Sequence, residues 1–550
     1  MTGVDERSWR RLSARMLLIH PIQELPRALP ALVGVLAAGR GSGHGELWGV
    51  LGVVIPVGLG MIRWLTTRYR VTNDRVEVRQ GLLRRRLLAV SRDRVRTVDV
   101  TSHALHRLLG LSRVTVGTGR SDRERGGAVR LDGLTAAESA ELRDELLHRG
   151  PASWAATPQP LGAAAPQPLG AATPEPLDPA AEQELARLDA RWVWYAPFTL
   201  SGAVAVGAAA GFLANASREA NVDPKGFGPL RDLVDQLDGA PAVAAVAELV
   251  VLALAVVAVA STVGYVLAFW DFRLTRRPGA LHVHRGLLTT RETTIEERRL
   301  HGVELSEPLL LRMVGGARCI AVATGLRVGR GAERGGSLLL PPAPRAEAER
   351  VGAGVMARDV PDRRAEIDGG EATERMAERD GGAVRAPLRP HGPRARRRRY
   401  VRALGAWAVL VGVLGAASAL PWWPGWPWHV ALALVVAALA LAADRYRSLG
   451  HAAAGTALVT RYGSLVRRRC ALDAGGIIGW NLERSFFQRR AGLATLVATT
   501  AAGRQSYEVQ DVEVDEAIRL AERLLPGLLD PFLDRPAPSA VVTPSASAAG

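Results

Sequence analysis

The sequence predicts a mixed α and β membrane protein in which about six transmembrane helices form three hairpins. Each hairpin is followed by a small cytoplasmic β-barrel that ends in a helix. Two observations support this class: uncharged apolar runs recur in pairs, and a similar strand-rich segment follows each pair. The 550-residue chain is 48% hydrophobic with a formal net charge of +16. These averages resemble a soluble basic protein, but the apolar and basic residues are segregated along the chain.

The two later pairs of apolar runs are the clearest. A spanning helix needs about 20 mostly apolar residues. Leu249–Trp270 and its partner Trp192–Ala214 contain no charge, and Glu248 stands just before the former. The third pair is Ala403–Leu420 and Trp426–Ala443, joined by a turn rich in Trp and Pro. Uncharged runs of this length favour membrane spans over buried helices of a soluble protein.

The first pair of apolar runs is weaker. Leu47–Leu65 has the composition of a span, with Arg63 at its end. Ala28–Gly39 is short and flanked by arginines, so its length alone also suits a re-entrant or interfacial segment. We expect it to span because it would then form a hairpin like the other two pairs.

Arginine placement predicts the orientation. Arginines follow the second, fourth and sixth apolar runs and crowd the N-terminus, whereas the opposite loops are short or poor in basic residues. The positive-inside rule then puts both termini and all three barrels in the cytoplasm of a multipass cell-membrane protein. The basic residues abutting the fifth run are expected to be membrane-proximal: Arg396, Arg397, Arg398 and Arg399.

The segments after the apolar pairs form a threefold repeat: Tyr69–Gly119, Phe272–Gly325 and the more diverged Tyr446–Gly503. Each begins with an aromatic-Arg pair and continues as strand, glycine turn, strand, Leu/Phe-rich stretch ending in glycine, and strand. The strands alternate apolar and polar residues, which is typical of half-buried strands. The turn glycines, where a hairpin must reverse, are Gly81, Gly286 and Gly463.

A helix is expected at the end of each repeat. Thr135 with Glu138 forms a capping-box pattern in the first copy. The third copy has apolar residues at helical spacing from Ala517 to Leu524, and the second has a weaker counterpart near Arg345–Arg358. Several antiparallel strands closed by one C-terminal helix describe a small, partly open barrel.

The pattern resembles bacterial membrane proteins with pleckstrin-homology-like (PH-like) domains of the YdbS/YdbT type. The third copy has lost most of the early motif, and the second inserts Pro278 and Gly279. The LIHPIQEL stretch before the first helix also resembles this family. The resemblance implies three tandem PH-like domains on a membrane anchor and no established activity. It rests on Arg70, Thr72, Arg75, Gly81, Arg94, Arg107 and Gly110 in the first copy; Arg273, Thr275, Gly286, Arg312 and Gly315 in the second; and Tyr446, Arg447, Arg489 and Gly492 in the third.

The expected domain organisation follows from these elements. Pro-, Ala- and charge-rich stretches separate the three hairpin-plus-barrel units. The boundaries are 1–66 for the N-terminal segment and first hairpin, 67–150 for PH-like domain 1, 151–190 for a Pro/Ala-rich linker, 191–270 for the second hairpin, 271–358 for PH-like domain 2, 359–400 for a basic linker, 401–443 for the third hairpin, 444–530 for PH-like domain 3 and 531–550 for a disordered tail.

The sequence contains few candidate residues for catalysis or for binding a cofactor. It lacks a Gly-x-Ser-x-Gly elbow, a His-Glu-x-x-His motif and a Walker-type lysine loop. His282 and His284 share one strand face and with His301 could hold a metal, but no carboxylate or cysteine completes the set. We therefore expect no catalytic residue, no metal and no cofactor. Nucleic acid is not expected as a partner, because no aromatic residues interleave with the basic clusters.

Two arginine triplets are the candidates for binding lipid headgroups. They fall just after the equivalent hairpin turn of the first and third repeats: Arg84, Arg85 and Arg86, and Arg467, Arg468 and Arg469. Near an anionic surface each charge contributes about 1 kcal/mol. The alternative is that they are solvated strand ends and topology signals.

The leading functional hypothesis is a non-enzymatic interaction or scaffold platform at the cell envelope, with an unknown protein partner that could be a second copy of the chain. The alternative is a protein that binds or handles anionic lipids. A transporter or membrane enzyme is disfavoured, because the apolar runs lack the mid-depth ionisable groups that such proteins use.

Overall fold

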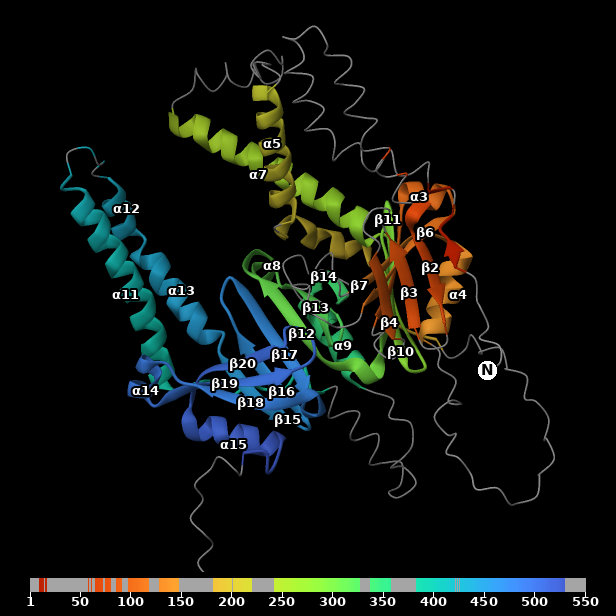
Figure 1. Cartoon of the computed structure of the whole chain (residues 1–550). Helices are drawn as coiled ribbons and strands as arrows, with labels where there is room; N and C mark the ends of the chain where they lie inside the picture. The colour runs from red at the N-terminus through yellow and green to blue at the C-terminus, as the bar shows by residue number, and fades with distance from the viewer. Residues whose placement is uncertain are drawn as a thin grey trace, which may run out of the picture. The chain divides into compact units, whose positions relative to one another are not determined.

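Figure 1 shows the computed structural model of the chain. The structure describes residues 9–13, 15–16, 58, 61, 65–72, 75–80, 86–91, 97–117, 128–147, 182–199, 201–219, 242–326, 337–357, 382–420, 422, 424 and 426–529. They belong to two compact units. Unit 1 comprises Met1–Arg385 with Leu465–Cys470 and Ala501–Gln505, and unit 2 comprises Ala386–Ser464, Ala471–Thr500 and Ser506–Gly550.

Each repeat of the sequence forms one module with the same order of elements: three strands, a fourth strand, a short helix, two more strands and a C-terminal helix. In module 1 these are β2 (Arg68–Val71), β3 (Arg75–Gln80), β4 (Arg86–Ser91), β5 (Thr97–His103), α3 (Ala104–Leu108), β6 (Leu111–Gly117), β7 (Ala128–Thr135) and α4 (Ala136–Leu147).

Modules 2 and 3 repeat this order, each with a 3-10 turn before its fourth strand. Module 2 contains β9 (Arg273–Arg277), β10 (Ala280–Arg285), β11 (Thr289–Glu296), η5 (Glu297–Arg299), β12 (Leu300–Pro308), α8 (Leu309–Met313), β13 (Gly316–Ala323), β14 (Leu338–Pro344) and α9 (Arg345–Met356). Module 3 contains β15 (Gly450–Ala454), β16 (Ala457–Tyr462), β17 (Val466–Asp473), η6 (Ala474–Gly476), β18 (Ile477–Glu483), α14 (Phe486–Ala491), β19 (Leu493–Thr500), β20 (Ser506–Glu513) and α15 (Val514–Leu524).

Several local predictions are confirmed. The Thr135 backbone N–H donates to Glu138 at 2.9 Å while the Glu138 N–H donates to the Thr135 hydroxyl at 3.2 Å, so the capping box starts α4. The apolar stripe of α15 is buried as expected. Gly286 and Gly463 adopt φ of +108° and +96°, a region that favours glycine, at the expected hairpin reversals.

The modules do not close into separate barrels, because strands pair across module boundaries. In unit 1 the sheet order β7-β6-β5-β11-β10-β9-β8 joins modules 1 and 2 through an antiparallel β5–β11 pair. A second sheet runs β14-β13-β12 and continues to β17, whose residues up to Cys470 belong to unit 1. Each module therefore contributes strands to two sheets.

The core of module 1 follows the strand alternation. Buried side chains come from both groups of strands and from the C-terminal helix; they include Val76, Val78, Val98, Val114, Val116, Leu131 and Leu142. Intervening positions point outward and are polar, as in β6 with its alternating burial.

Short strands that precede the apolar helices complete the sheets. β1 (Arg10–Arg11) pairs with β2, and β8 (Gln183–Arg187) pairs with β9. In unit 2 Arg389 forms an isolated bridge with His451 on β15. The stretches 183–190 and 389–400, which the sequence assigned to linkers, thus contain sheet-forming residues and the start of a helix.

Apolar helices leave the modules in pairs. α7 (Ala242–Phe269) packs against α5 (Ser201–Glu219), which follows the 3-10 helix η3 (Ala190–Phe198), and α11 (Pro393–Ala417) packs against α12 (Pro427–Ala433) and α13 (Val435–Arg447). In the described part of the chain two helices, Ala244–Phe269 and Pro393–Ala417, are long and apolar enough to cross a membrane, and the count reaches four if each bent pair is one span. The six expected spans are therefore not established. Most of the first expected pair, and the LIHPIQEL stretch, lie outside the described residues.

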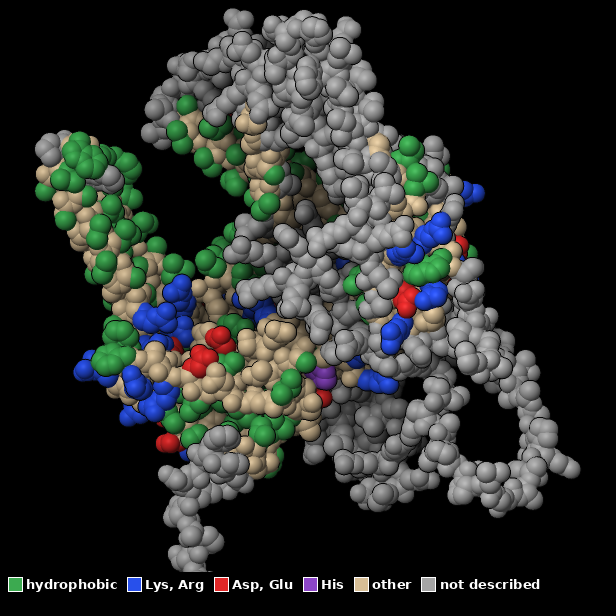
Figure 2. Space-filling view, in the orientation of Figure 1, with side chains coloured by type: hydrophobic (Ala, Val, Ile, Leu, Met, Phe, Trp, Pro, Cys, Tyr) green, Lys and Arg blue, Asp and Glu red, His purple; other side chains and the backbone are tan. Residues whose placement is uncertain are grey.

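The surface of the third hairpin has the polarity of a membrane segment. Apolar side chains cover α11, α12 and α13, and basic side chains gather where these helices meet the strands of unit 2 (Figure 2). α11 begins at Pro393, so the arginine run lies in the first turns of this helix.

Candidate functional site

The end of α7 is held by the turn between β10 and β11. The Gly286 N–H donates to the Trp270 carbonyl at 2.8 Å, and the Leu287 N–H donates to the Leu267 carbonyl at 2.9 Å. These bonds satisfy carbonyls that a helix end leaves without partners. A Cβ on Gly286 would lie 2.1 Å from the Thr289 carbonyl oxygen, so the tight turn requires glycine.

Module 1 reaches the same turn. The Arg107 guanidinium, on α3, donates to the Leu287 carbonyl at 2.8 Å. His103, at the end of β5, lies 3.0 Å from the Thr289 hydroxyl. Three parts of unit 1, namely α7, the β10–β11 turn and α3, therefore meet at one place.

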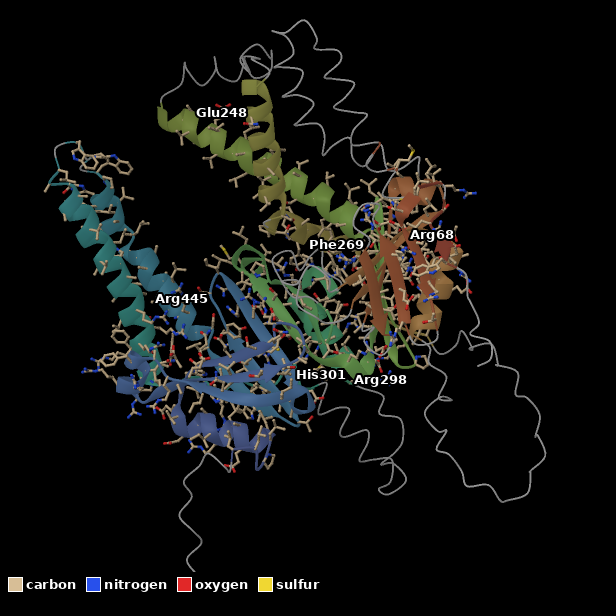
Figure 3. The ribbon with its side chains drawn as sticks, viewed as in Figure 1. Arg68, Glu248, Phe269, Arg298, His301 and Arg445 are labelled. Carbon is tan, nitrogen blue, oxygen red and sulfur yellow. The ribbon has the colours of Figure 1, made fainter. Side chains whose placement is uncertain are left out.

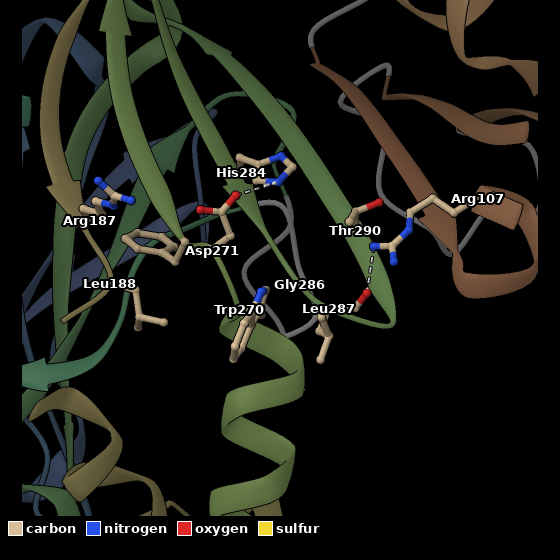
Figure 4. Close-up of a pocket in the computed structure, with 10 residues that line it drawn as sticks. Arg107, Arg187, Leu188, Trp270, Asp271, His284, Gly286, Leu287 and Thr290 are labelled. Atoms are coloured by element: carbon tan, nitrogen blue, oxygen red, sulfur yellow. Dashed lines mark hydrogen bonds and ion pairs between the residues drawn. The ribbon is translucent and has the colours of Figure 1, made fainter. Parts of the chain in front are cut away.

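A cavity of about 540 Å³ opens at this place. That volume falls within the range of small-molecule sites. Figure 4 shows Arg187, Trp270 and His284 around it, with Arg107 at the side opposite Arg187, bonded to the turn at Leu287. The remaining lining residues are Leu188, Asp271, Phe272, Gly286, Leu287 and Thr290.

The charge of the cavity lining is positive. Asp271 is the only carboxylate among the lining residues, and it is engaged by Arg273 at 3.1 Å and by His284 at 3.9 Å. Among the described residues, neither Arg107 nor Arg187 has an ion-pair partner. Each guanidinium group has donors for an anion such as a phosphate, which guanidinium binds through paired hydrogen bonds.

Exposed apolar side chains stand beside the cavity. Leu108 is 82% exposed on α3, Leu288 is 52% exposed on the β10–β11 turn, and Trp270 is 49% exposed at the end of α7. Large apolar side chains next to arginines at the end of an apolar helix have the composition of a membrane–water interface.

Module 3 repeats part of this arrangement within unit 2. The turn residue Ser464 lies 3.4 Å from the guanidinium of Arg445, near the end of α13. The short helix α14 exposes Phe486 and Phe487. In every module the glycine that ends the short helix has positive φ: Gly110, Gly315 and Gly492.

The third-module arginine triplet is placed inside unit 1. Arg468 lies 3.2 Å from Glu304 and Arg467 lies 3.5 Å from Glu307; both carboxylates are buried. Arg469 is itself buried. These charges are compensated or enclosed, so they do not form an open basic patch. Of the first-module triplet, Arg84 and Arg85 lie outside the described residues, and Arg86 begins β4.

The membrane-proximal arginines divide into two pairs. Arg396 and Arg397 are exposed. Arg398 and Arg399 are ion-paired with Asp511, whose side chain is 1% exposed and also accepts a hydrogen bond from Gln488 at 3.0 Å. The second pair thus fixes α11 to β20.

The histidines of module 2 lie on strands and contact neighbouring side chains there. His282 lies 3.0 Å from the Thr294 hydroxyl, and burial together with the charge of Arg277 lowers its pKa to about 4. No group of three or more His, Cys, Asp or Glu side chains suited to a metal ion occurs in the described part of the chain. Sequence reasoning missed the cavity: Arg107 was matched only as a motif residue, and Arg187 lies in the stretch assigned to a linker.

Fold and site together define a protein of repeated β-modules, of which modules 2 and 3 follow apolar helices, with a basic cavity at the end of one of these helices. A family model described as bacterial PH domain matches three regions, residues 24–150, 236–356 and 404–527, which cover more than half of the chain. The chain therefore belongs to the bacterial PH domain family, in three tandem copies, and this family points to a module that interacts with lipid or protein. No curated protein and no solved structure matches the chain.

Proposed function

We propose that this protein is a non-enzymatic, membrane-anchored protein that binds anionic lipid headgroups with its PH-like modules. The cavity at the end of α7 is the proposed binding site. The observation that carries the proposal is the position of Arg107 and Arg187, two guanidinium groups with no ion-pair partner among the described residues, beside the end of a helix suited to span a membrane. In this proposal the modules face the cytoplasm, where anionic lipids are concentrated.

The position of the cavity at the end of α7 places it at the expected level of the lipid headgroups, which supports a headgroup rather than an acyl chain as the ligand. Trp270 directly follows α7, and Trp is enriched at the level of the headgroups. The phosphate would bind in the cavity at Arg107 or Arg187, while Leu108 and Leu288 would contact the acyl-chain boundary. Asp271 is neutralised by Arg273, so it does not oppose the bound anion.

The test uses the purified full chain in neutral detergent and two soluble short-chain lipids, a phosphatidylglycerol and a phosphatidylcholine. Isothermal titration should detect binding of the anionic lipid and a weaker response to the zwitterionic one. The double variant Arg107→Ala with Arg187→Ala should bind the anionic lipid roughly tenfold or more weakly, because two charges near the phosphate are lost.

Arg298→Ala is the matched control. Arg298 is exposed, and in Figure 3 it lies at the end of module 2 away from Phe269, the last residue of α7. This variant removes one positive charge from an exposed position of module 2 that does not line the cavity, and it should leave binding unchanged. Equal affinity for the two lipids, or an unchanged affinity in the double variant, would contradict the proposal.

A scaffold role is the second candidate, favoured by the shared sheet of modules 1 and 2. The β5–β11 pair and the ion pair between Arg291 and Asp99 join these modules within one compact unit. A shared sheet of this kind can hold a partner protein across more than one module.

A further inference from the structure

Successive modules pair through equivalent strands, and each of these strand pairings is called a join. Strand four of module 1, β5, pairs with strand three of module 2, β11. Strand four of module 2, β12, neighbours strand three of module 3, β17, and within unit 1 the Leu309 N–H donates to the Leu465 carbonyl at 2.7 Å. Each join therefore runs from strand four of one module to strand three of the next.

The two joins also use equivalent ion pairs. Arg291 and Arg468 each stand five residues after the turn glycine of their module. Asp99 and Glu304 each stand eleven residues before the glycine that ends the short helix. Arg291 pairs with Asp99, and Arg468 pairs with Glu304. The same type of ion pair, at equivalent positions, therefore occurs at both joins.

This pattern leaves one third strand and one fourth strand with an edge that pairs with no other described strand. Among the described strands, β4 pairs only with β3, and β18 pairs only with β19. Most of β12 is buried, whereas most of β18 is exposed, with Ile478 at 67%. β4 is the third strand of module 1 and β18 is the fourth strand of module 3. The chain therefore carries the two halves of the join at its opposite ends.

We propose that β18 of one copy pairs antiparallel with β4 of a second copy, so that full-length chains assemble head to tail. The occupant is a second copy because this contact continues an interface already present in the chain. A contact between two different surfaces is heterologous, and it builds a ring if the rotation closes or an open row if it does not. Unpaired edge strands are templates for such pairing.

The register of the existing join predicts complementary residues across the new one. In the β5–β11 pair Arg291 lies opposite Thr101, and Glu292 lies opposite Val100. The equivalent positions put Arg86 of β4 opposite Glu483 of β18, and Leu87 opposite Leu482. The position of Asp99 and Glu304 is occupied by Asn481 in β18, so the acid that complements Arg86 in this pairing is Glu483, directly across the strands. Opposite charges placed directly across two strands stabilise the pair, and like charges destabilise it.

Charge reversal separates this contact from unspecific association. Glu483→Arg alone places arginine opposite arginine, and Arg86→Glu alone places glutamate opposite glutamate. Each variant alone should assemble at a roughly tenfold or more higher concentration than the wild type, because both changes set like charges across the strands. A mixture of the two variants restores both attractive pairs and should assemble like the wild type.

Mass photometry of the full chain in detergent and in lipid nanodiscs measures the outcome. The matched controls, Asp515→Arg and Arg298→Glu, make the same charge changes at exposed positions away from both edges. We expect wild-type oligomers, smaller species for each single variant, and recovery on mixing. A wild type that stays monomeric at all concentrations, or single variants that assemble like the controls, would overturn the proposal.

A disulfide test distinguishes a second copy from closure within one chain. The double variant Arg86→Cys with Glu483→Cys is oxidised in membranes; the natural cysteines, Cys319 and Cys470, are buried. We expect a ladder of linked chains on a non-reducing gel, lost on reduction and absent from each single-cysteine variant. A disulfide within one chain, or no linkage, would refute pairing between copies.

Discussion

Glu304 on β12 lies 3.2 Å from the guanidinium of Arg468 on β17, at the position that Asp99 and Arg291 occupy between modules 1 and 2. Glu304 is 1% exposed and also pairs with Arg504 at 3.0 Å. A buried carboxylate needs such partners, because its transfer from water is costly when unpaired. Two equivalent acid–arginine pairs thus mark the two joins of the chain.

The first prediction concerns the Asp99–Arg291 pair. A double-mutant cycle with Asp99→Asn and Arg291→Gln should give a coupling free energy of about 1–3 kcal/mol, because both side chains are partly buried and bidentate. The measurement is denaturant unfolding of the detergent-solubilised chain. The exposed pair of Glu182 and Arg277, 3.2 Å apart, should give less than about 1 kcal/mol in the same cycle. Equal coupling for the two pairs would contradict the assigned role.

The second prediction concerns Asp511, which anchors α11 to module 3. Asp511→Asn keeps the side-chain shape but leaves Arg398 and Arg399 without a carboxylate, so the free energy of unfolding should fall by about 3–5 kcal/mol. Thermal unfolding measures the loss. Asp515→Asn, an exposed change on α15, should stay within about 0.5 kcal/mol of the wild type. A small effect at Asp511 would show that the arginines find other partners.

The third prediction concerns pH. His391 and His451 contact each other at 3.0 Å in unit 2, beside Glu516 and the Asp511 carbonyl. Burial, and then the charge of His451, lowers the pKa of His391 to about 4, and burial lowers the pKa of His451. An unfolded histidine has a pKa of about 6.5, so the unfolded state binds more protons between these values. Stability should therefore fall as the pH decreases from about 6.5 to 4.

The variant His391→Gln isolates this contribution. It removes one titrating group, so its loss of stability between pH 6.5 and 4 should be smaller than that of the wild type by up to about 3 kcal/mol. Denaturant unfolding at several pH values measures both slopes. Parallel curves for the two proteins would show that acid sensitivity arises elsewhere.

The fourth prediction compares two glycines of module 2. Gly286→Ala forces a Cβ against the Thr289 carbonyl, whereas a Cβ on Gly279, at φ +78°, meets nothing within 4 Å. Gly279→Ala should lower the free energy of unfolding by about 1–2 kcal/mol through backbone strain alone. Gly286→Ala should lower the free energy of unfolding by more and should expose the end of α7, seen as faster exchange of the backbone N–H groups at positions 286 and 287. Equal costs would refute the requirement for close approach in that turn.

The sequence was sufficient to predict the modules. Alternating strands, the turn glycines and the Thr135–Glu138 capping box are local patterns, and local patterns report local structure. The short strands before the helices were missed because β1 and β8 are too brief and too polar to show alternation. The helix boundaries were also shifted, since α11 starts within an arginine run that hydropathy places outside a span.

The candidate site could not be predicted from local sequence patterns. Arg107 and Leu287 are 180 positions apart, and only the pairing of β5 with β11 brings them together. The triplet at Arg467–Arg469 shows the opposite problem. A run of charges suggests an open surface, but Glu304 and Glu307, which neutralise it, lie far away in the sequence.

The most direct measurement of the central claim uses a photoreactive anionic phospholipid with its reactive group in the headgroup. Full-length protein in vesicles that contain this lipid is irradiated, and the labelled peptides are mapped by mass spectrometry. We predict labelling of the β10–β11 turn at Leu287–Thr290 and of α3 near Arg107, lost in the double variant Arg107→Ala with Arg187→Ala. Labelling confined to the exposed faces of α5 and α7, or unchanged in that variant, would contradict the account.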